Sequence, residues 1–123
     1  MRIGAYLTSQ KDNYHLLDDT LIFHTALPNM VDKSTDNTKA LLIETDPLVT
    51  KIFRQQLSYC GYGTIISVET GEEGVLLALT ESPDLIIVDI ELPNMNGWQL
   101  IDILQESKIT QKIPVIALVP SPI

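Results

Sequence analysis

Short apolar runs alternate with longer segments of helical periodicity between residues 39 and 119. Each run is apolar at successive positions rather than at every second one, which is typical of strands that are buried on both faces. Strands of this kind, separated by helices, form a doubly wound parallel α/β sheet. The strands that this pattern predicts are residues 40–43, 64–68, 85–88 and 113–119.

Helix signals stand between these runs. Asp46 followed by Pro47 is a typical helix start, because the carboxylate caps free N–H groups and proline suits the first helical position. Gly61 can end that helix in a left-handed conformation. Thr70 and Glu73 have the spacing of a capping box. The three predicted helices run from Pro47 to Gly61, from Thr70 to Pro83 and from Gly97 to Ser107.

Residues 1–38 lie outside this alternation, and we interpret them as an extension that precedes a domain over residues 39–123. Residues 2–8 can form a strand, and residues 13–27 carry apolar positions at helical spacing. Residues 28–38 are rich in Ser, Thr, Asn and Asp, which is typical of a linker. A sheet of only four strands leaves an edge bare, so we expect the extension, or a second copy of the chain, to cover it.

The charge balance argues against one class of partner. The chain has 16 acidic and 8 basic residues, and its net charge is −8. Nucleic-acid binding depends on clustered Lys and Arg, so direct binding to DNA or RNA is not expected.

No apolar run is long enough to cross a bilayer, and no secretory signal accompanies the single cysteine, Cys60. We therefore expect a cytoplasmic protein without a membrane span.

Acidic residues follow two of the predicted strands. Glu44 ends the first and Asp89 ends the third, and in a doubly wound sheet both lie at the edge where ligands bind. With Asp46 they offer hard oxygen ligands that suit Mg²⁺, which can screen a carboxylate as it attacks a phosphoryl group. Simpler roles stay open, since Asp46 can serve only as the helix cap and Glu44 can simply face solvent. No Gly-rich phosphate loop or nucleophile elbow is present, so no enzyme is predicted.

Three segments, LLIETDP, PDLIIVDIELPNMNGWQLI and IPVIALV, resemble response-regulator receiver domains, which have a flavodoxin-like or CheY-like fold. The resemblance implies that Asp89 is the phosphorylated aspartate of a two-component system. It also implies that Glu44 is the first of two acids that hold Mg²⁺, and that Glu91 offers its backbone carbonyl to the metal. Pro93 and Gly97 match the family's turn before the third helix.

The sequence departs from the receiver pattern at positions that matter for signalling. Thr45 replaces the second metal-binding acid, and Asp46 is one place late, so its side chain points elsewhere in an extended segment. Val119 stands where the family has a Thr or Ser that bonds the phosphoryl group, and Pro120 replaces the small residue after it. The chain then ends at Ile123, before the family's fourth helix, fifth strand and fifth helix. We therefore expect a degenerate receiver, truncated after the fourth strand.

The segment IGAYLTSQKDNYHLLDDTLIFHTAL resembles the end of a receiver, with its fifth strand and fifth helix. In this comparison Ser9-Gln10 replaces the family's Lys-Pro, and Lys11 is two places late. Three origins stay open: a remnant of two tandem receivers, a circularly permuted receiver, or an unrelated extension that docks on a partner. The permuted alternative requires residues 2–8 to pair beside residues 113–119.

Three functions are compatible with these features. The leading hypothesis is an atypical receiver, or pseudo-receiver, that acts by binding a partner protein, with phosphorylation at Asp89 weak or absent. The first rival is a phosphorelay receiver that is phosphorylated at Asp89 with Mg²⁺ and uses Asp46 in place of the missing acid. The second rival is a structural subunit of a larger assembly. The expected partners are a histidine kinase, another receiver, an assembly subunit or a second copy of the chain.

Overall fold

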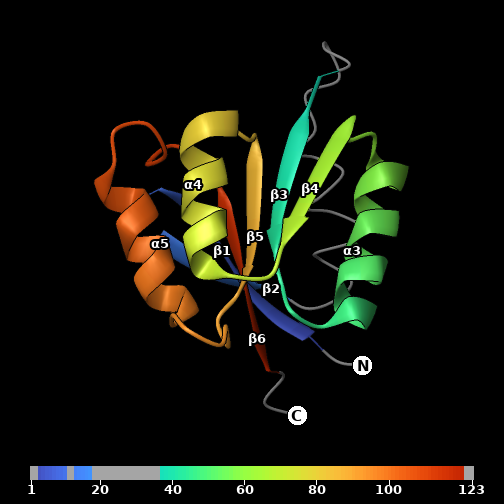
Figure 1. Ribbon diagram of the computed structural model, residues 1–123, viewed down its shortest axis with the longest axis horizontal. Coiled ribbons are helices and arrows are strands. Elements are labelled where there is room, and N and C mark those ends of the chain that lie inside the picture. Colours follow the sequence, from blue (N-terminus) through green and yellow to red (C-terminus); the bar gives the residue numbers. More distant parts are fainter. Residues whose placement is uncertain (1–2, 11–12, 18–36, 121–123) are drawn as a thin grey trace.

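The computed structural model describes residues 3–10, 13–17 and 37–120, which contain a six-stranded sheet and three helices (Figure 1). The strand order across the sheet is β2-β1-β6-β5-β3-β4. The strands are β1 Ile3–Gln10, β2 Asn13–Leu17, β3 Lys39–Ile43, β4 Thr64–Val68, β5 Leu85–Asp89 and β6 Val115–Pro120. The helices are α3 Pro47–Cys60, α4 Gly71–Glu81 and α5 Gly97–Glu106. None of the helices in these ranges is long and apolar enough to cross a membrane.

Strands β3 to β6 are parallel, as the apolar runs predict. The chain leaves β3 for β4 on one side and then crosses to β5 on the other, so the strand order reverses between β3 and β5. Such a switch point opens a crevice at the carboxyl ends of the two strands. The predicted α/β fold is confirmed, and its switch point lies between the strands that end at Glu44 and Asp89.

The predicted helix signals are confirmed by hydrogen bonds. The Leu48 N–H donates to Oδ1 of Asp46 at 2.9 Å, which caps α3. Gly61 ends α3 with a φ of 105°, a conformation that glycine adopts without strain. The Glu73 N–H donates to Oγ1 of Thr70 at 3.2 Å and caps α4 in the same way. Local sequence therefore determines where these helices begin and end.

The two faces of the sheet bury separate groups of apolar side chains. Side chains of α3 pack on one face, and those of α4 and α5 pack on the other. Strand β5 contributes Leu85 and Ile87 to the first group and Ile86 and Val88 to the second, and all four are fully buried. Successive residues of β5 thus pack against helices on opposite faces of the sheet, which explains why the strand is apolar at every position.

The N-terminal strands form an antiparallel hairpin that extends the sheet beyond β6. β1 pairs with β6 so that Ile3 lies opposite Pro120 and Thr8 lies opposite Val115. Strand β2 then pairs with the outer side of β1. The sequence predicts a strand at residues 2–8, and β1 occupies that position. The free edge of β6 that suggested a homodimer is therefore paired within the chain.

Two expectations for the N-terminal segment are corrected. Residues 13–17 form strand β2, so the predicted helix over 13–27 is wrong there, and residues 18–27 lie outside the described residues. Apolar spacing in so short a segment fits a helix or a strand, and pairing with β1 decides the matter. Residues 2–8 do pair beside residues 113–119, as the permuted-receiver alternative requires, but β1 is antiparallel to β6, whereas the fifth strand of a doubly wound parallel sheet is parallel. Of the predicted linker 28–38, only residues 37 and 38 are described.

Candidate functional site

Asp89 is the last residue of β5 and lies where the parallel strands end. Its Oδ1 accepts a hydrogen bond from the Glu91 N–H at 2.9 Å. The turn that follows is tied to the sheet, because the Ile90 N–H donates to the Leu118 carbonyl at 3.1 Å. The Gly97 N–H closes the turn by donating to the Ile90 carbonyl at 2.9 Å. The half-buried Asp89 carboxyl group is therefore held beside a firmly anchored turn.

Gly97 is required by the close approach of this turn to α5. A Cβ atom on residue 97 would collide with the Cα of Ile90 and would lie 2.7 Å from the Asp89 carbonyl oxygen. Both obstacles are backbone atoms, which cannot move aside as the end of a flexible side chain can. The glycine of the PNMNG segment thus allows the start of α5 to pack directly against the residue that follows Asp89.

Glu44 follows β3 and faces Asp89 across the switch point. Its side chain is only 4 % exposed, and Oε1 accepts hydrogen bonds from the N–H groups of Thr45 at 2.9 Å and Asp46 at 3.0 Å. Burial, first of all, and then a hydrogen bond with the Asp89 carboxyl group raise the pKa of Glu44 from 4.5 to about 7, although the two N–H groups lower it. Glu44 therefore holds its proton to a higher pH than a solvent-exposed glutamate does.

The residues after Glu44 do not bring a second buried acid to the site. Thr45 is half-buried and neutral, whereas Asp46 is exposed. The Asp46 carboxylate accepts the Leu48 N–H at the start of α3, which is the role of a helix cap. A role of Asp46 in metal binding would require this cap to be shared or broken.

On the other side of Asp89, strand β6 continues past the site without turning away. Asp89 lies opposite Leu118, and the next residue, Val119, pairs with Gly4 of β1. The start of β1 therefore lies at the site edge, while its last residue, Gln10, lies at the opposite edge of the sheet. The Ser9-Gln10 pair that aligns with the family's Lys-Pro is thus far from Asp89, because β1 runs antiparallel to β6.

The carboxylate pair offers limited ligation to a metal ion. Among residues 37–120 and the described parts of the hairpin, no group of three or more His, Cys, Asp or Glu side chains is placed to hold one. Glu44 and Asp89 remain, with the backbone carbonyl of Glu91 nearby in sequence. Mg²⁺ often binds through one or two carboxylates and keeps several waters, so this pair fits a weakly held ion.

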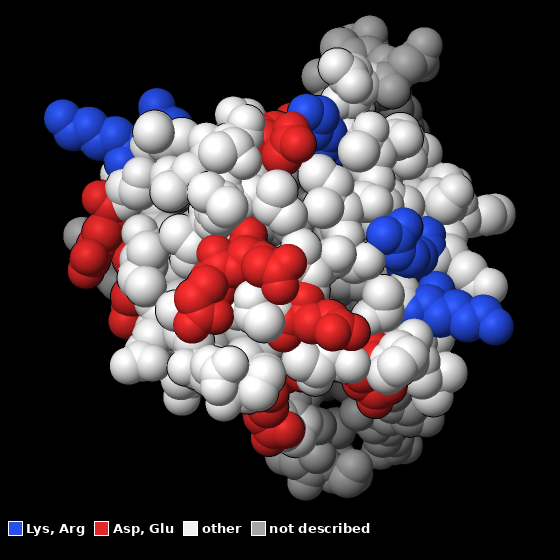
Figure 2. All heavy atoms as spheres, in the orientation of Figure 1, with Lys and Arg blue, Asp and Glu red and all other residues white. Residues whose placement is uncertain are grey.

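Charged side chains divide between the two helical layers. Figure 2 shows acidic side chains gathered over the centre and left of the molecule, where α4 and α5 lie, and basic side chains over α3 at the right and along the upper edge. The sequences of α4 and α5 contain no Lys or Arg, whereas α3 contains Lys51 and Arg54 and no acidic residue. An acidic protein therefore has one basic helix next to its candidate site.

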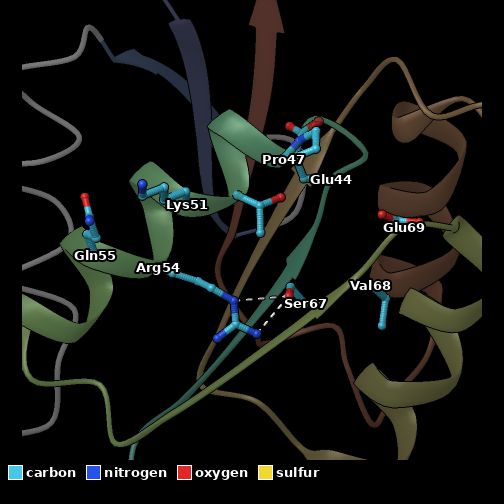
Figure 3. Close-up of a pocket in the computed structure, with 9 residues that line it drawn as sticks. Glu44, Pro47, Lys51, Arg54, Gln55, Ser67, Val68 and Glu69 are labelled. Carbon is cyan, nitrogen blue, oxygen red and sulfur yellow. Dashed lines mark hydrogen bonds between the residues drawn. The ribbon is translucent and has the colours of Figure 1, made fainter.

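A groove beside this basic helix was not predicted from the sequence. It has a volume of about 510 Å³ and lies between α3 and the end of β4 (Figure 3). The only available signal was the helical spacing of polar residues 50, 51, 54 and 55, which a solvent-facing helix shows equally well. The lining residues are Glu44, Pro47, Thr50, Lys51, Arg54, Gln55, Ser67, Val68 and Glu69.

Comparison with known proteins decides the family. A sequence model of the response regulator receiver domain matches residues 40–121. The chain belongs to this receiver family. Transcriptional regulatory protein HprR of Escherichia coli (strain K12) is 44% identical over 80 residues, which are 65% of this chain and 34% of that protein. Polar-differentiation response regulator DivK of Brucella ovis is 36% identical over 78 residues, which are 63% of each chain.

Solved receiver structures share the fold. The MaeR response regulator bound to beryllium trifluoride is 32% identical, with a TM-score of 0.63 over 70% of both chains. Chemotaxis response regulator CheY4 of Vibrio cholerae is 20% identical, with a TM-score of 0.60 over 64% of this chain and 65% of that one. The receiver described here spans 34% of the length of HprR and 63% of that of DivK.

Proposed function

We propose that this receiver domain signals by binding a partner protein, with little or no phosphorylation at Asp89. One observation carries the proposal: Val119 pairs with Gly4 of the antiparallel β1. Val119 thus takes the position where a phosphorylated receiver is expected to have a hydroxyl group. The start of β1, which runs antiparallel, takes the position where such a receiver is expected to supply a lysine.

A phosphoryl group on Asp89 would gain few contacts that favour a second conformation. Its described neighbours include the Glu44 carboxyl group, which repels an anion when it is ionised. The strand beside it, β6, pairs Leu118 with Asp89 and continues to Val119, whose side chain carries no hydroxyl group. A modification shifts a conformational equilibrium only through contacts that differ between the two states. Phosphorylation usually gains such contacts from nearby cations and hydrogen-bond donors. We therefore expect phosphorylation of Asp89 to change the conformation only slightly.

Phosphorylation with a small-molecule donor tests this proposal. Incubation with acetyl phosphate and Mg²⁺, followed by intact-mass spectrometry, is expected to show only a minor phosphorylated fraction. The matched control is Asp89→Asn, which removes the acceptor and keeps the size of the side chain. Stoichiometric modification that Asp89→Asn abolishes would contradict the proposal.

A fully phosphorylatable receiver is the second candidate, and the retained carboxylate pair favours it. Asp89 still ends β5 beside Glu44, on a turn held by backbone hydrogen bonds. The similar MaeR response regulator binds beryllium trifluoride. In this alternative Mg²⁺ is held by Glu44, Asp89 and the carbonyl of Glu91, and Asp46 contributes only if it leaves the helix cap. Stoichiometric acetyl phosphate labelling would support this candidate.

The partner is proposed to be a cytoplasmic protein of a two-component pathway, such as a histidine kinase or another receiver. Its affinity, measured by isothermal titration calorimetry, should be the same for the wild type and for Asp89→Asn. The hypothesis of a structural subunit loses its main support, because β1 already pairs with the edge of β6. A stable oligomer in size-exclusion chromatography with light scattering would restore it.

A further inference from the structure

The outer edge of β4 is open to another strand. Within the described residues β4 is the last strand of the sheet and pairs only with β3. The Thr64 N–H donates to the Thr38 carbonyl at 3.1 Å, and the Val68 carbonyl accepts a bond from the same side. In a parallel pair every second residue bonds to its neighbour, so the backbone groups of Ile65 and Ser67 face outward. These groups form a short template for strand addition.

The basic groove lies directly beside this edge (Figure 3). Lys51 and Arg54 are exposed on its α3 wall, and neither forms an ion pair with a residue of the described chain. The Arg54 guanidinium donates to Oγ of Ser67 at 2.8 Å, which holds it over β4. Glu44 and Glu69 lie at the end of the groove near the candidate site. Positive charge is therefore placed over Ser67, near the end of β4.

We propose that the open edge of β4 binds an extended acidic segment of a partner protein, which adds to the sheet as a further strand. Main-chain hydrogen bonds to Ile65 and Ser67 would supply affinity, as in other cases of strand addition. Side chains of the added strand would alternate between the two faces of the sheet. Acidic residues on the α3 face would meet Lys51 and Arg54, and a neutral residue would suit the position near Glu69.

A second copy of this chain fits the edge less well. If two β4 edges paired about a twofold axis, Lys51 and Arg54 of one copy would face the same residues of the other. Each chain also carries a net charge of −8. Like charges placed together oppose association, whereas an acidic segment matches the basic groove.

Two variants of one residue test the backbone part of the proposal. The probe is a fluorescein-labelled extended peptide in which glutamate alternates with valine, and its binding is followed by fluorescence anisotropy. Ser67→Pro removes the outward N–H and leaves the bonds between β3 and β4, so we expect about tenfold weaker binding. Ser67→Ala keeps the N–H and loses only the hydroxyl, so affinity should fall less than about threefold. Equal binding by the two variants would overturn strand addition.

Charge reversal tests the specificity part and does not depend on a proline being tolerated. Arg54→Glu should weaken binding of the glutamate peptide by about tenfold or more, whereas Lys112→Glu, which makes the same change outside the groove, should leave it within about twofold. The wild type should not bind a control peptide that has lysine in place of glutamate. Equal affinity for the two peptides would contradict the proposal that the bound segment is acidic.

Hydrogen exchange gives a direct view of the edge. With the glutamate peptide bound, the amide protons of Ile65 and Ser67 should exchange at least about tenfold more slowly, and that of Ile66, which already faces β3, should not change. Protection of Ile65 and Ser67 without peptide would contradict an open edge.

The inference rests on the proposed binding of a protein partner. Failure of peptide binding alone rejects this surface, whereas stoichiometric acetyl phosphate labelling rejects the proposed function.

Discussion

The two neighbours of β6 make opposite contributions to the site. β5 runs parallel to β6 and brings Asp89 to the ligand edge, next to Glu44 at the end of β3. β1 runs antiparallel to β6 and brings Ile3 and Gly4 to the same edge. The β5 side thus places two acidic residues at the site edge, whereas the β1 side brings Ile3 and Gly4, residue types without a cation or a hydroxyl group.

This difference separates two requirements of a phosphorylation switch. Accepting a phosphoryl group requires an acid at the site, and Glu44 and Asp89 place acids there. The response to that group needs donors on the far side of the site, and those depend on the direction of the strand beside β6. In the proposed function, the loss of these donors removes the response to phosphorylation and leaves the fold available for partner binding.

Removing the hairpin is the most drastic way to test the comparison. Deletion of residues 1–17 would expose the edge of β6, a strand whose residues Ile116 and Ala117 are 0 % and 1 % exposed. We expect a loss of more than about 5 kcal/mol of folding free energy, or oligomers that pair the free edges. Urea denaturation and size-exclusion chromatography measure the two outcomes. Ala5→Pro is a milder variant, because it removes only one N–H from the middle of β1. A deletion variant that is monomeric and as stable as the wild type would show that β1 is dispensable.

A second test concerns the turn on the β5 side. Gly97→Ala is expected to cost about 2–3 kcal/mol in urea denaturation, because the new Cβ meets the backbone of Ile90 and Asp89. Gly71→Ala is the matched control, since its Cβ would meet only side-chain atoms, the nearest being Sδ of the flexible Met95 at 2.9 Å. Similar losses for the two variants would mean that the turn after Asp89 is less rigid than its hydrogen bonds indicate.

The pH dependence of stability tests the carboxylate pair. The pKa of Glu44 is raised from 4.5 to about 7, so the folded protein binds more protons than the unfolded chain between these values. Stability should therefore fall by about 3 kcal/mol as the pH rises through this window, and the loss should be complete above it.

The variant Glu44→Gln stays neutral, keeps the acceptor oxygen and can donate to Asp89. Its stability should exceed that of the wild type at about pH 8, with little difference at about pH 5, when both are measured by urea denaturation. The exposed Glu69→Gln serves as the control and should not alter the slope. Parallel pH profiles for Glu44→Gln and the wild type would contradict the sharing of a proton between Glu44 and Asp89.

Restoring one hydroxyl group should have the smallest effect. Val119→Thr is expected to change stability by less than about 1 kcal/mol, since Val119 is only half-buried. Its acetyl phosphate labelling should rise less than about tenfold, because one hydrogen bond is restored and the other missing groups are not. Val119→Ala controls for the change in shape. Stoichiometric labelling of Val119→Thr would show that the hydroxyl alone limits the reaction and that the direction of β1 does not matter.

Much of the receiver part could be predicted because its signals are local. The cap at Asp46, the stop at Gly61 and the capping box at Thr70 act within one helical turn, and the structure has each of them. The placement of Glu44 and Asp89 at one edge followed from parallel strands. The raised pKa of Glu44 could not be predicted, since it depends on how deeply the side chain is buried.

The N-terminal segment shows where this kind of prediction ends. Periodicity allowed a helix over residues 13–27, and nothing within that segment indicated that its first residues pair with β1. The groove beside Arg54 could not be predicted either. A polar helix face is typical of a helix that faces solvent, and only the position of β4 shows that this face lines a groove. Both features arise from contacts between distant segments.

The pattern of residues along the chain predicts the alternation of strands and helices, the helix ends, the parallel strands and the position of Asp89 at the sheet edge. These depend on apolar periodicity and on caps, which act between near neighbours in the chain. Three features become visible only in the folded chain: β1 lies antiparallel beside β6, Glu44 and Asp89 meet in a buried crevice, and β4 ends the described sheet with an open edge. The physical reason is that strand direction, burial and edge position are set by packing against segments far away in the sequence.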